Sequence, residues 1–516
     1  MRTLTFRMAI IATTALTAPA FAQDDLKIVD EPLNLTIHMH WPRSQGYNEN
    51  YPVEKAAAAM TGIHLKDATA GRNTTESNEA MNLLLAQGKM PDIVGGHLIK
   101  QPVNQYGPEG AFLPLNDLVK QYAPNIQAFF DSHPDILKSI TAYDGNYYYI
   151  PYLPDGKFGR AYFIRQDWLD KLGLKQPQTV DEFHDVLVAF RDRDPNGNGR
   201  KDEIPFFARE WPEVIRLVTL WDARSSGSDT NHDFYVTDDG KVVHPYAQEA
   251  YRDALSNLAG WYKEKLIDPE VFTRGNSARD YLLSENLGGA THDWFASTAG
   301  YNEALADKVP GMNFVAMLPP ASAGGKRVEE HRRIPVKPDG WAIGYQNKNP
   351  VETIKYFDFW FTEPGRNLAN FGVEGQQWDM VNGEPTYKPE VLNSDMAVNS
   401  QMYEIGAQIQ RGYWQDYRYE WQWTSEAARK GIELYEANDL LLPDFLGVNF
   451  NKEEQAIYDR YWPSILTYML ERQQAWVLGT GDVKADWDGY ISTLNKMGYA
   501  QVIEVMNTAY KRQYGG

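Results

Sequence analysis

Strand-like and helix-like stretches alternate between residues 33 and 96, and this alternation limits the fold more than any other feature of the chain. In the first stretch apolar and polar side chains alternate with a period of two, which is typical of a β-strand. The next stretch begins with a proline and ends before a glycine, as many helices do. The predicted order is strand 33–40, helix 52–60, strand 63–68, helix 75–87 and strand 93–96. Strands that alternate with helices pair in parallel, so we expect an α/β fold with doubly wound sheets.

Doubly wound sheets bind their ligands at the carboxyl ends of their strands. In this chain the first of those ends carries His40 and Trp41, and the third strand ends at Gly95 and Gly96. Aromatic residues are abundant, with 15 Trp, 31 Tyr and 21 Phe, more than a core alone requires. Rings with polar tips suit a long binding cleft. We therefore expect His40 and Trp41 to contact a ligand.

The first 22 residues have the pattern of a cleavable secretory signal peptide. Arg2 and Arg7 form a basic start, residues 8–18 are apolar, and residues 20–22 form a small-x-small cleavage site. The apolar run is too short for a bilayer-spanning helix, which needs about 20 residues. The chain has no cysteine, which excludes disulfides, thiolate metal sites and an N-terminal lipid anchor on cysteine. We expect a periplasmic protein that is neither lipidated nor embedded in the membrane.

The charge balance argues against one large class of partner. The chain has 50 Lys and Arg against 69 Asp and Glu, a formal net charge of −19. Proteins that bind nucleic acids need a basic surplus to replace the counterions on phosphates. We therefore expect no nucleic-acid partner.

A ten-residue stretch has the ligand spacing of an EF-hand-like calcium loop. Calcium takes six to eight oxygen ligands, and Gly197 and Gly199 suit the tight turn of such a loop. Pro205 stands where an EF-hand has its bidentate glutamate, so the last acidic ligand has to come from the end of the stretch. A polar turn without metal is the alternative. The predicted Ca²⁺ ligands are Asp194, Asn196, Asn198, the carbonyl of Arg200, Asp202 and Glu203.

Catalysis is the competing class of function. His38, His40, His292 and Asp293 could form a metal or acid–base cluster, and a polysaccharide lyase or hydrolase would need such a group. However, the chain has no H-E-x-x-H zinc motif and no G-x-S-x-G nucleophile elbow. We expect that the protein is not an enzyme.

A resemblance to a known family covers nearly the whole chain. Six phrases resemble the extracellular solute-binding proteins of sugar-uptake ABC transporters, at residues 87–94, 110–115, 144–151, 162–169, 261–270 and 486–490. Within that family the chain is most similar to the periplasmic alginate-binding proteins. The residues that carry this closer resemblance are 37–40, 194–199, 223–229, 291–298 and 414–417.

The resemblance implies a two-lobe periplasmic binding protein fold of type II, with a hinge that closes on an oligosaccharide. The expected N-terminal lobe is 23–150 with 311–367, and the C-terminal lobe is 151–310 with 368–516, which helices at 424–436 and 453–474 wrap. It also implies a structural calcium far from the sugar, delivery to a membrane permease, and a monomer. The expected ligand is alginate or a similar acidic uronate. A neutral plant oligosaccharide and a role in chemoreception are the alternatives.

A sugar cleft needs aromatic rings for the apolar faces of the pyranoses and cations for uronate carboxylates. A guanidinium binds a carboxylate through two parallel hydrogen bonds. Arg160, Arg224 and Arg43 are therefore the cation candidates. The predicted sugar contacts are His40, Trp41, Arg43, Tyr148, Tyr152, Arg160, Arg224, Asp293, Trp294, Trp414 and Asp416.

Overall fold

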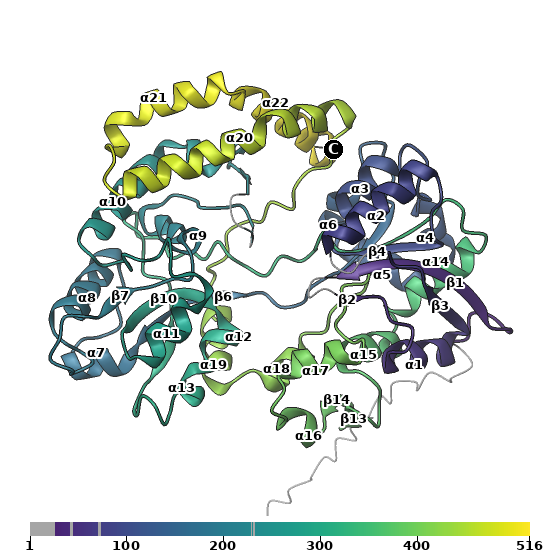
Figure 1. The fold of residues 1–516 in the computed structure, drawn as a ribbon, viewed down its shortest axis with the longest axis horizontal. Helices are drawn as coiled ribbons and strands as arrows, with labels where there is room; N and C mark the ends of the chain where they lie inside the picture. Colours follow the sequence, from purple (N-terminus) through teal and green to yellow (C-terminus); the bar gives the residue numbers. More distant parts are fainter. Residues whose placement is uncertain (1–25, 42–44, 71–73, 229, 231–232, 516) are drawn as a thin grey trace, which may run out of the picture.

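The computed structural model describes residues 26–41, 45–70, 74–228, 230 and 233–515. The expected signal peptide and Arg43 lie outside the described residues. The chain folds into two α/β lobes, each built on its own sheet (Figure 1). Among the described helices, none is both long and apolar enough to cross a bilayer.

The first sheet confirms the strands that the alternating pattern predicts. Its strands are β1 (Leu33–Trp41), β2 (Gln45–Gly46), β3 (Ile63–Asp67), β4 (Ile93–Gly96), β5 (Tyr149–Pro151) and β12 (Gly340–Ile343). They are ordered β2-β1-β4-β12-β5, and β3 also pairs with β1. β1 runs parallel to β3 and β4, as the intervening helices require, whereas β12 is antiparallel to β4 and β5.

The second sheet differs from the expected division of the chain. Its strands are β6 (Arg160–Arg165), β7 (Ile204–Phe206), β10 (Gly288–Trp294) and β11 (Phe314–Met317), ordered β11-β6-β10-β7. The sequence places the return to the first lobe near Gly311, but β11 pairs antiparallel with β6. The chain therefore leaves the second lobe only after Met317. It also stays longer in the first lobe than residue 367, because Trp378, Met402 and Tyr413 are buried in the first core.

Helices cover both sheets and form most of the C-terminal third. Those of the first lobe are α1 (Pro52–Thr61), α2 (Thr74–Gln87), α3 (Lys100–Tyr106), α4 (Asn116–Tyr122), α5 (Pro124–Ser132), α6 (Pro134–Ile140), α14 (Pro350–Phe359), α15 (Glu363–Phe371), α16 (Pro389–Leu392) and α17 (Val398–Glu404). Between α15 and α16 lies a hairpin of β13 (Trp378–Val381) and β14 (Glu384–Tyr387).

The second lobe carries the longest helix, α20 (Lys452–Val477). Its other helices are α7 (Gln166–Leu172), α8 (Val180–Asp192), α9 (Trp211–Val214), α10 (Glu249–Lys263), α11 (Ala278–Ser284), α12 (Phe295–Thr298), α13 (Tyr301–Ala304), α19 (Glu426–Glu436), α21 (Val483–Lys496) and α22 (Tyr499–Tyr514). Helix α18 (Arg418–Trp423) contacts both lobes, because Tyr419 is buried in the first core and Trp421 packs on a core of the second lobe. A 3₁₀ helix (Ile215–Trp221) follows α9, and a small hairpin joins β8 (Tyr235–Val236) to β9 (Val242–Val243). Helices α19 and α20 confirm the helices expected at 424–436 and 453–474, and α20 packs on α10 and α22 (Figure 1).

Three chain segments lie side by side where the lobes join. The middle segment follows β5, and there Leu153 N–H donates to the Tyr413 carbonyl at 3.0 Å. On its other side Tyr152 N–H donates to the Asp339 carbonyl at 2.8 Å, and Arg333 N–H to the Lys157 carbonyl at 2.9 Å. These backbone bonds hold the three segments together as a hinge. Because the chain crosses this hinge three times, neither lobe is a continuous stretch of the sequence.

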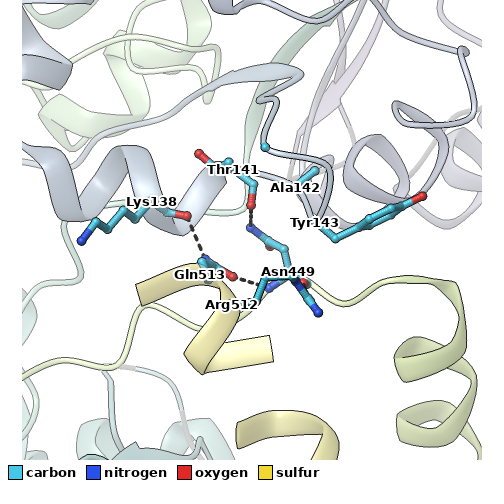
Figure 2. A pocket seen from close by; sticks show the side chains of 8 residues that line it. Lys138, Thr141, Ala142, Tyr143, Asn449, Arg512 and Gln513 are labelled. Carbon is cyan, nitrogen blue, oxygen red and sulfur yellow. Dashed lines mark hydrogen bonds between the residues drawn. The ribbon is translucent and has the colours of Figure 1, made fainter. Parts of the chain in front are cut away.

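The C-terminal end of the chain makes a further link between the lobes (Figure 2). Asn449, in the loop before α20, donates from Nδ2 to the Thr141 carbonyl at 2.7 Å. The same atom also donates to the Ser139 carbonyl at 2.9 Å. Gln513, near the end of α22, donates from Nε2 to the Lys138 carbonyl at 2.8 Å. The three acceptors lie in the last turn of α6 or directly after it, so the C-terminal helix and the loop before α20 are held directly to the first lobe.

Candidate functional site

The end of β10 places a tryptophan beside an arginine. In the antiparallel pair of β6 and β10, Trp294 lies directly opposite Arg160. The Arg160 guanidinium lies over the indole ring, with its central carbon 3.9 Å from the ring centroid. Arg160 is buried, whereas Trp294 is partly exposed. A Cβ at Gly159 would lie 3.0 Å from the indole, so the glycine leaves the ring its space.

Beneath this pair the buried Glu213 of α9 faces three guanidiniums. Arg160 Nη1 donates to it at 3.2 Å, and Arg209 donates from Nε at 3.3 Å and also from Nη2. Arg216 Nη1 lies 3.9 Å from the same carboxylate. Burial alone would raise the pKa of Glu213, but the Arg209 hydrogen bond and the three positive charges lower it to about 2. The carboxylate is therefore ionised at neutral pH.

Asp293 is the second buried carboxylate of this group. Arg279, from α11, donates from Nη1 to Asp293 at 2.6 Å. Arg209 Nη2 lies 3.4 Å and Arg160 Nη1 3.9 Å from the other carboxylate oxygen. Four arginines thus surround two buried carboxylates next to Trp294, while Glu210 and Glu329 act on Arg209 and Arg216 from outside these contacts.

A small pocket of about 190 Å³ opens beside Trp294 and reaches the hinge. Arg333 and Glu420 form a bidentate ion pair there, at 2.9 and 2.6 Å, and Arg333 lies 5.0 Å from the ring centroid of Tyr417. Sequence reasoning missed these residues together with Arg209, Arg216, Glu213 and Arg279. The spacing of Arg209, Glu213 and Arg216, four and then three residues apart, could have indicated the cluster, because side chains at these spacings are neighbours on a helix.

Trp414 lies at the hinge and is held by the first lobe. The Arg366 guanidinium covers its ring at 3.8 Å, and the rings of Phe129 and His133 pack against it at centroid distances of 5.2 and 6.3 Å. The side chain remains partly exposed. Two residues on, the buried Asp416 accepts hydrogen bonds from its own neighbour Arg418.

The two tyrosines among the candidates are buried. Tyr148 donates to Asp144 at 2.6 Å and packs against Gly107, within the first core. Tyr152 stacks on Tyr413 at 5.2 Å, within the hinge. The structure therefore brings Arg160, Asp293 and Trp294 together, but it places both tyrosines in packed surroundings.

The remaining sequence candidates lie on other elements. His40 is buried near the end of β1, and within the described residues neither ring nitrogen has a hydrogen-bond partner. Burial, followed by the nearby His97, lowers its pKa. Trp41 is the last residue of β1. Arg224 pairs with Glu330 at 3.2 Å and donates to the Ser226 carbonyl at 3.0 Å, so its guanidinium is already bound within the second lobe.

A larger cavity of about 570 Å³ lies between the lobes. Of two adjacent hinge residues, Ile334 lines this cavity and Arg333 lines the small pocket beside Trp294. Lys100 of α3 lines the cavity, and burial lowers its pKa to about 8 against the opposing charge of Asp233. The rings and amides that line it include Asn104, Gln105, Phe234, Phe450 and Tyr458. Such a mixture of aromatic and polar groups is typical of ligand pockets of this size.

The predicted calcium loop is compact and lies between α8 and β7. Asp194 accepts backbone N–H groups from Gly197 at 2.9 Å, Asn198 at 3.0 Å and Gly199 at 3.0 Å. The side-chain oxygens of Asn196 and Asn198 each accept the N–H two residues on, at 3.0 and 2.8 Å. These bonds fold the oxygen-bearing side chains into one turn.

Glu203 provides the test of whether this loop fits a cation. It is 6% exposed, and in the described part of the chain neither carboxylate oxygen has a hydrogen-bond partner. Burial raises its pKa. Among the described residues no three His, Asp or Glu side chains converge to hold a metal by themselves, so a cation would also need the amide and carbonyl oxygens. Hard oxygen donors of this kind are those that calcium prefers, and the loop therefore fits the ion.

Comparison with known proteins gives one family. The family model described as bacterial extracellular solute-binding protein matches residues 44–367. Among curated proteins, the chain is 24% identical over 471 residues to the fructooligosaccharide ABC transporter substrate-binding protein FusA of Streptococcus pneumoniae, with 87% of this chain and 85% of FusA covered. It is 36% identical over 316 residues to the polygalacturonan/rhamnogalacturonan-binding protein YtcQ of Bacillus subtilis, with 58% of each chain covered.

Solved structures share the whole fold. The crystal structure of the alginate-binding protein AlgQ2 without calcium ion matches with a TM-score of 0.79 and 50% identity, over 94% of this chain and 99% of AlgQ2. An EF-hand mutant of FusA in complex with fructo-nystose matches with a TM-score of 0.67 and 19% identity, over 93% and 99% of the two chains. The second likeness supports the fold alone. Both cover nearly all of the chain, so the two-lobe arrangement is common to all three proteins.

Proposed function

The chain belongs to the bacterial extracellular solute-binding proteins, and we propose that it captures an acidic oligosaccharide or polysaccharide, alginate or a similar uronate, for an ABC importer. Its role is to bind the sugar and hand it intact to the membrane permease. The protein is proposed to act in the periplasm as a monomer, without a lipid anchor.

The observation that carries this proposal is the arrangement at the end of β10. A partly exposed indole, Trp294, lies beside four arginines whose guanidiniums gather around two buried carboxylates. An aromatic ring suits the apolar face of a pyranose, and a surplus of guanidinium suits its carboxylate. Two relatives support the same class of ligand, because AlgQ2 is alginate-binding and YtcQ binds polygalacturonan.

We assign the sugar contacts as follows. Trp294 and Trp414 stack on sugar rings, and a guanidinium beside Trp294 pairs with a carboxylate. Hinge closure between the lobes brings the end of β1 toward the end of β10 and expels water from the charged hydrogen bonds. The other proposed contacts are His40, Trp41, Arg43, Tyr148, Tyr152, Asp293 and Asp416.

Titrating binding against salt tests the ligand class. Isothermal titration calorimetry with an oligouronate should give an affinity that falls as the salt concentration rises, because screening weakens charge pairs. A neutral oligosaccharide of the same length should bind more weakly and without salt dependence. Tight, salt-independent binding of the neutral sugar would contradict the proposal, and a new reducing end or an unsaturated product would indicate an enzyme.

We further propose that the loop at 194–203 holds a structural Ca²⁺. The ligands would be the side chains of Asp194, Asn196, Asn198, Asp202 and Glu203 with the carbonyl of Arg200. Support comes from the two unpartnered oxygens of the buried Glu203 and from the oxygen-only donor set.

Calcium should raise the melting temperature, and a chelator should reverse the gain. An ion present at 100 times its Kd stabilises the folded state by about 2.7 kcal/mol. Asp194→Asn should abolish the gain in melting temperature without changing the sugar affinity. Asp239→Asn, at an aspartate whose side chain is 60% exposed, is the control and should keep the gain. Equal melting curves of the wild-type protein in calcium and in chelator would contradict this assignment.

A further inference from the structure

We propose that Arg209 and Arg279, neither of which the sequence singled out, recognise the carboxylate of a uronate bound at Trp294. This inference rests on the proposed function and names the side chains that would distinguish an acidic sugar from a neutral one. It gives Arg160, which is more deeply buried, the role of supporting the Trp294 ring.

The exposure of the guanidiniums separates the three arginines. The side chain of Arg160 is 7% exposed, whereas those of Arg279 and Arg209 are 14% and 22% exposed. Arg209 donates through Nε and Nη2, and Arg279 through Nε and Nη1. Within the described residues, Nη1 of Arg209 and Nη2 of Arg279 donate to no protein acceptor. Each guanidinium therefore has one nitrogen left for a ligand.

The protein itself holds these guanidiniums in place. Asp293 accepts from Arg279 at 2.6 Å and lies 3.4 Å from Arg209, while Glu213 accepts two bonds from Arg209. A guanidinium fixed in this way loses little conformational freedom when a ligand carboxylate binds. The buried carboxylates are therefore supports for the arginines as well as their counter-charges.

The charge count still leaves room for an anionic ligand. Glu213 and Asp293 supply two negative charges against the four positive charges of Arg160, Arg209, Arg216 and Arg279. Two further carboxylates act on the cluster from outside these contacts, Glu210 on Arg209 and Glu329 on Arg216. Glu210 is exposed, and Glu329 bonds His292 at 2.9 Å. Among the charges in direct contact, one ligand carboxylate would halve the excess.

Arg279 is also tied to the segment that carries the indole. Its Nη1 donates to Ser297 Oγ at 2.9 Å and to Thr298 Oγ1 at 3.3 Å, both in α12 directly after Trp294. The ring and the guanidinium therefore keep a fixed relation. A pyranose lying on the exposed part of the ring would have its carboxylate beside the arginines.

The test compares an oligouronate with its methyl ester, using calorimetry on the full-length protein. An ionised carboxylate can accept a charged N–H bond from the remaining nitrogen of each guanidinium, whereas the ester carries no charge. Arg279→Gln and Arg209→Gln should each weaken binding of the free acid about tenfold or more. Neither variant should change the affinity for the ester by more than about twofold, because the ester does not form the charged hydrogen bonds that the variants remove.

Arg274→Gln is the matched control. Arg274 lies in the same lobe, pairs with the fully buried Asp268 at 2.7 Å and covers the Tyr281 ring at 5.4 Å. Its loss should leave both affinities unchanged. Arg279→Lys and Arg209→Lys keep the charge but lose the planar fork, and they provide folded variants if the glutamine forms do not fold.

The outcomes separate two kinds of failure. If the wild-type protein binds neither ligand, the proposed function is wrong and this inference falls with it. If the wild-type protein binds the acid but the arginine variants lose nothing, or lose acid and ester equally, the assignment of Arg209 and Arg279 is overturned while the function stands. A loss confined to the acid supports the assignment.

Discussion

Two tryptophans of this molecule lie under arginine guanidiniums at nearly the same distance, 3.9 Å for Trp294 and 3.8 Å for Trp414. The neighbours of the two pairs differ. At Trp294 the arginine joins a cluster of guanidiniums around Glu213 and Asp293. At Trp414 the arginine donates to two backbone carbonyls, and aromatic rings pack against the indole.

The guanidinium lies at nearly the same distance from the ring in both pairs, so the groups around each pair determine whether it serves stability or binding. Arg366 holds the hinge segment around Trp414 to the first lobe, because its guanidinium donates to the carbonyls of Trp414 and Gln415 at 3.4 Å each. The Arg160 pair instead leaves a positive excess next to a partly exposed ring. We therefore expect the Arg366–Trp414 pair to matter more for stability and the Arg160–Trp294 pair more for sugar binding.

Removing the charge of Glu213 should have the largest effect. Glu213→Gln removes the carboxylate that three guanidiniums share and leaves Arg160 and Arg209 only their contacts with Asp293 at 3.9 and 3.4 Å. Breaking a buried ion pair in this way costs about 3–5 kcal/mol. Urea unfolding measures the loss, and Glu210→Gln, at an exposed glutamate three residues away, is the control. An unchanged urea midpoint would mean that the cluster contributes nothing to the second lobe.

The same variant gives a pH test with a defined sign. The folded pKa of Glu213, about 2, lies below the usual value of 4.5, so its stabilisation is fully present above about pH 4.5. It should be lost as the pH falls from 4.5 toward 2. The difference in unfolding free energy between the wild-type protein and Glu213→Gln should therefore shrink over that range. A constant difference would contradict the lowered pKa.

Trp294→Ala should weaken binding while leaving the fold nearly unchanged. If stacking on a sugar resembles stacking on a base, the loss is on the order of 1–3 kcal/mol in binding free energy. Calorimetry with an oligouronate measures it, and Trp294→Phe, which keeps a ring, should retain most of the affinity. Full affinity in the alanine variant would remove Trp294 from the site.

Trp414→Ala should lower stability as well as affinity. The ring is half-buried against Phe129 and His133, so its removal should cost about 1–2 kcal/mol of unfolding free energy, less than for a fully buried ring. We expect a loss of binding free energy on the order of 1 kcal/mol. A double-mutant cycle with Phe129→Ala should give a coupling near 1 kcal/mol. A loss of affinity with no loss of stability would make Trp414 a sugar platform of the same kind as Trp294.

The sequence predicted what is local in this fold. The period-two pattern at 33–40 and the glycine-terminated helix at 52–60 correspond to β1 and α1. In each case residues within a few positions of one another determine the structure.

The parts that could not be predicted depend on contacts between distant segments. The residues of β11 have no local pattern that selects β6 as their partner strand. The sequence therefore places the lobe boundary near Gly311, before β11 instead of after it. Arg279 lies 66 residues from Glu213 in the sequence, and isolated charges in so acidic a chain are typical of solvated faces. Only the register of β6 and β10 brings Arg160 to Trp294 and makes the cluster visible.

A crystal structure of the protein with a bound oligouronate would show directly where the sugar lies. We expect a pyranose ring against Trp294, with its carboxylate within hydrogen-bond distance of an arginine of the Glu213–Asp293 cluster. A sugar found instead in the interlobe cavity lined by Phe234, Phe450 and Tyr458, with Trp294 uncovered, would contradict this expectation.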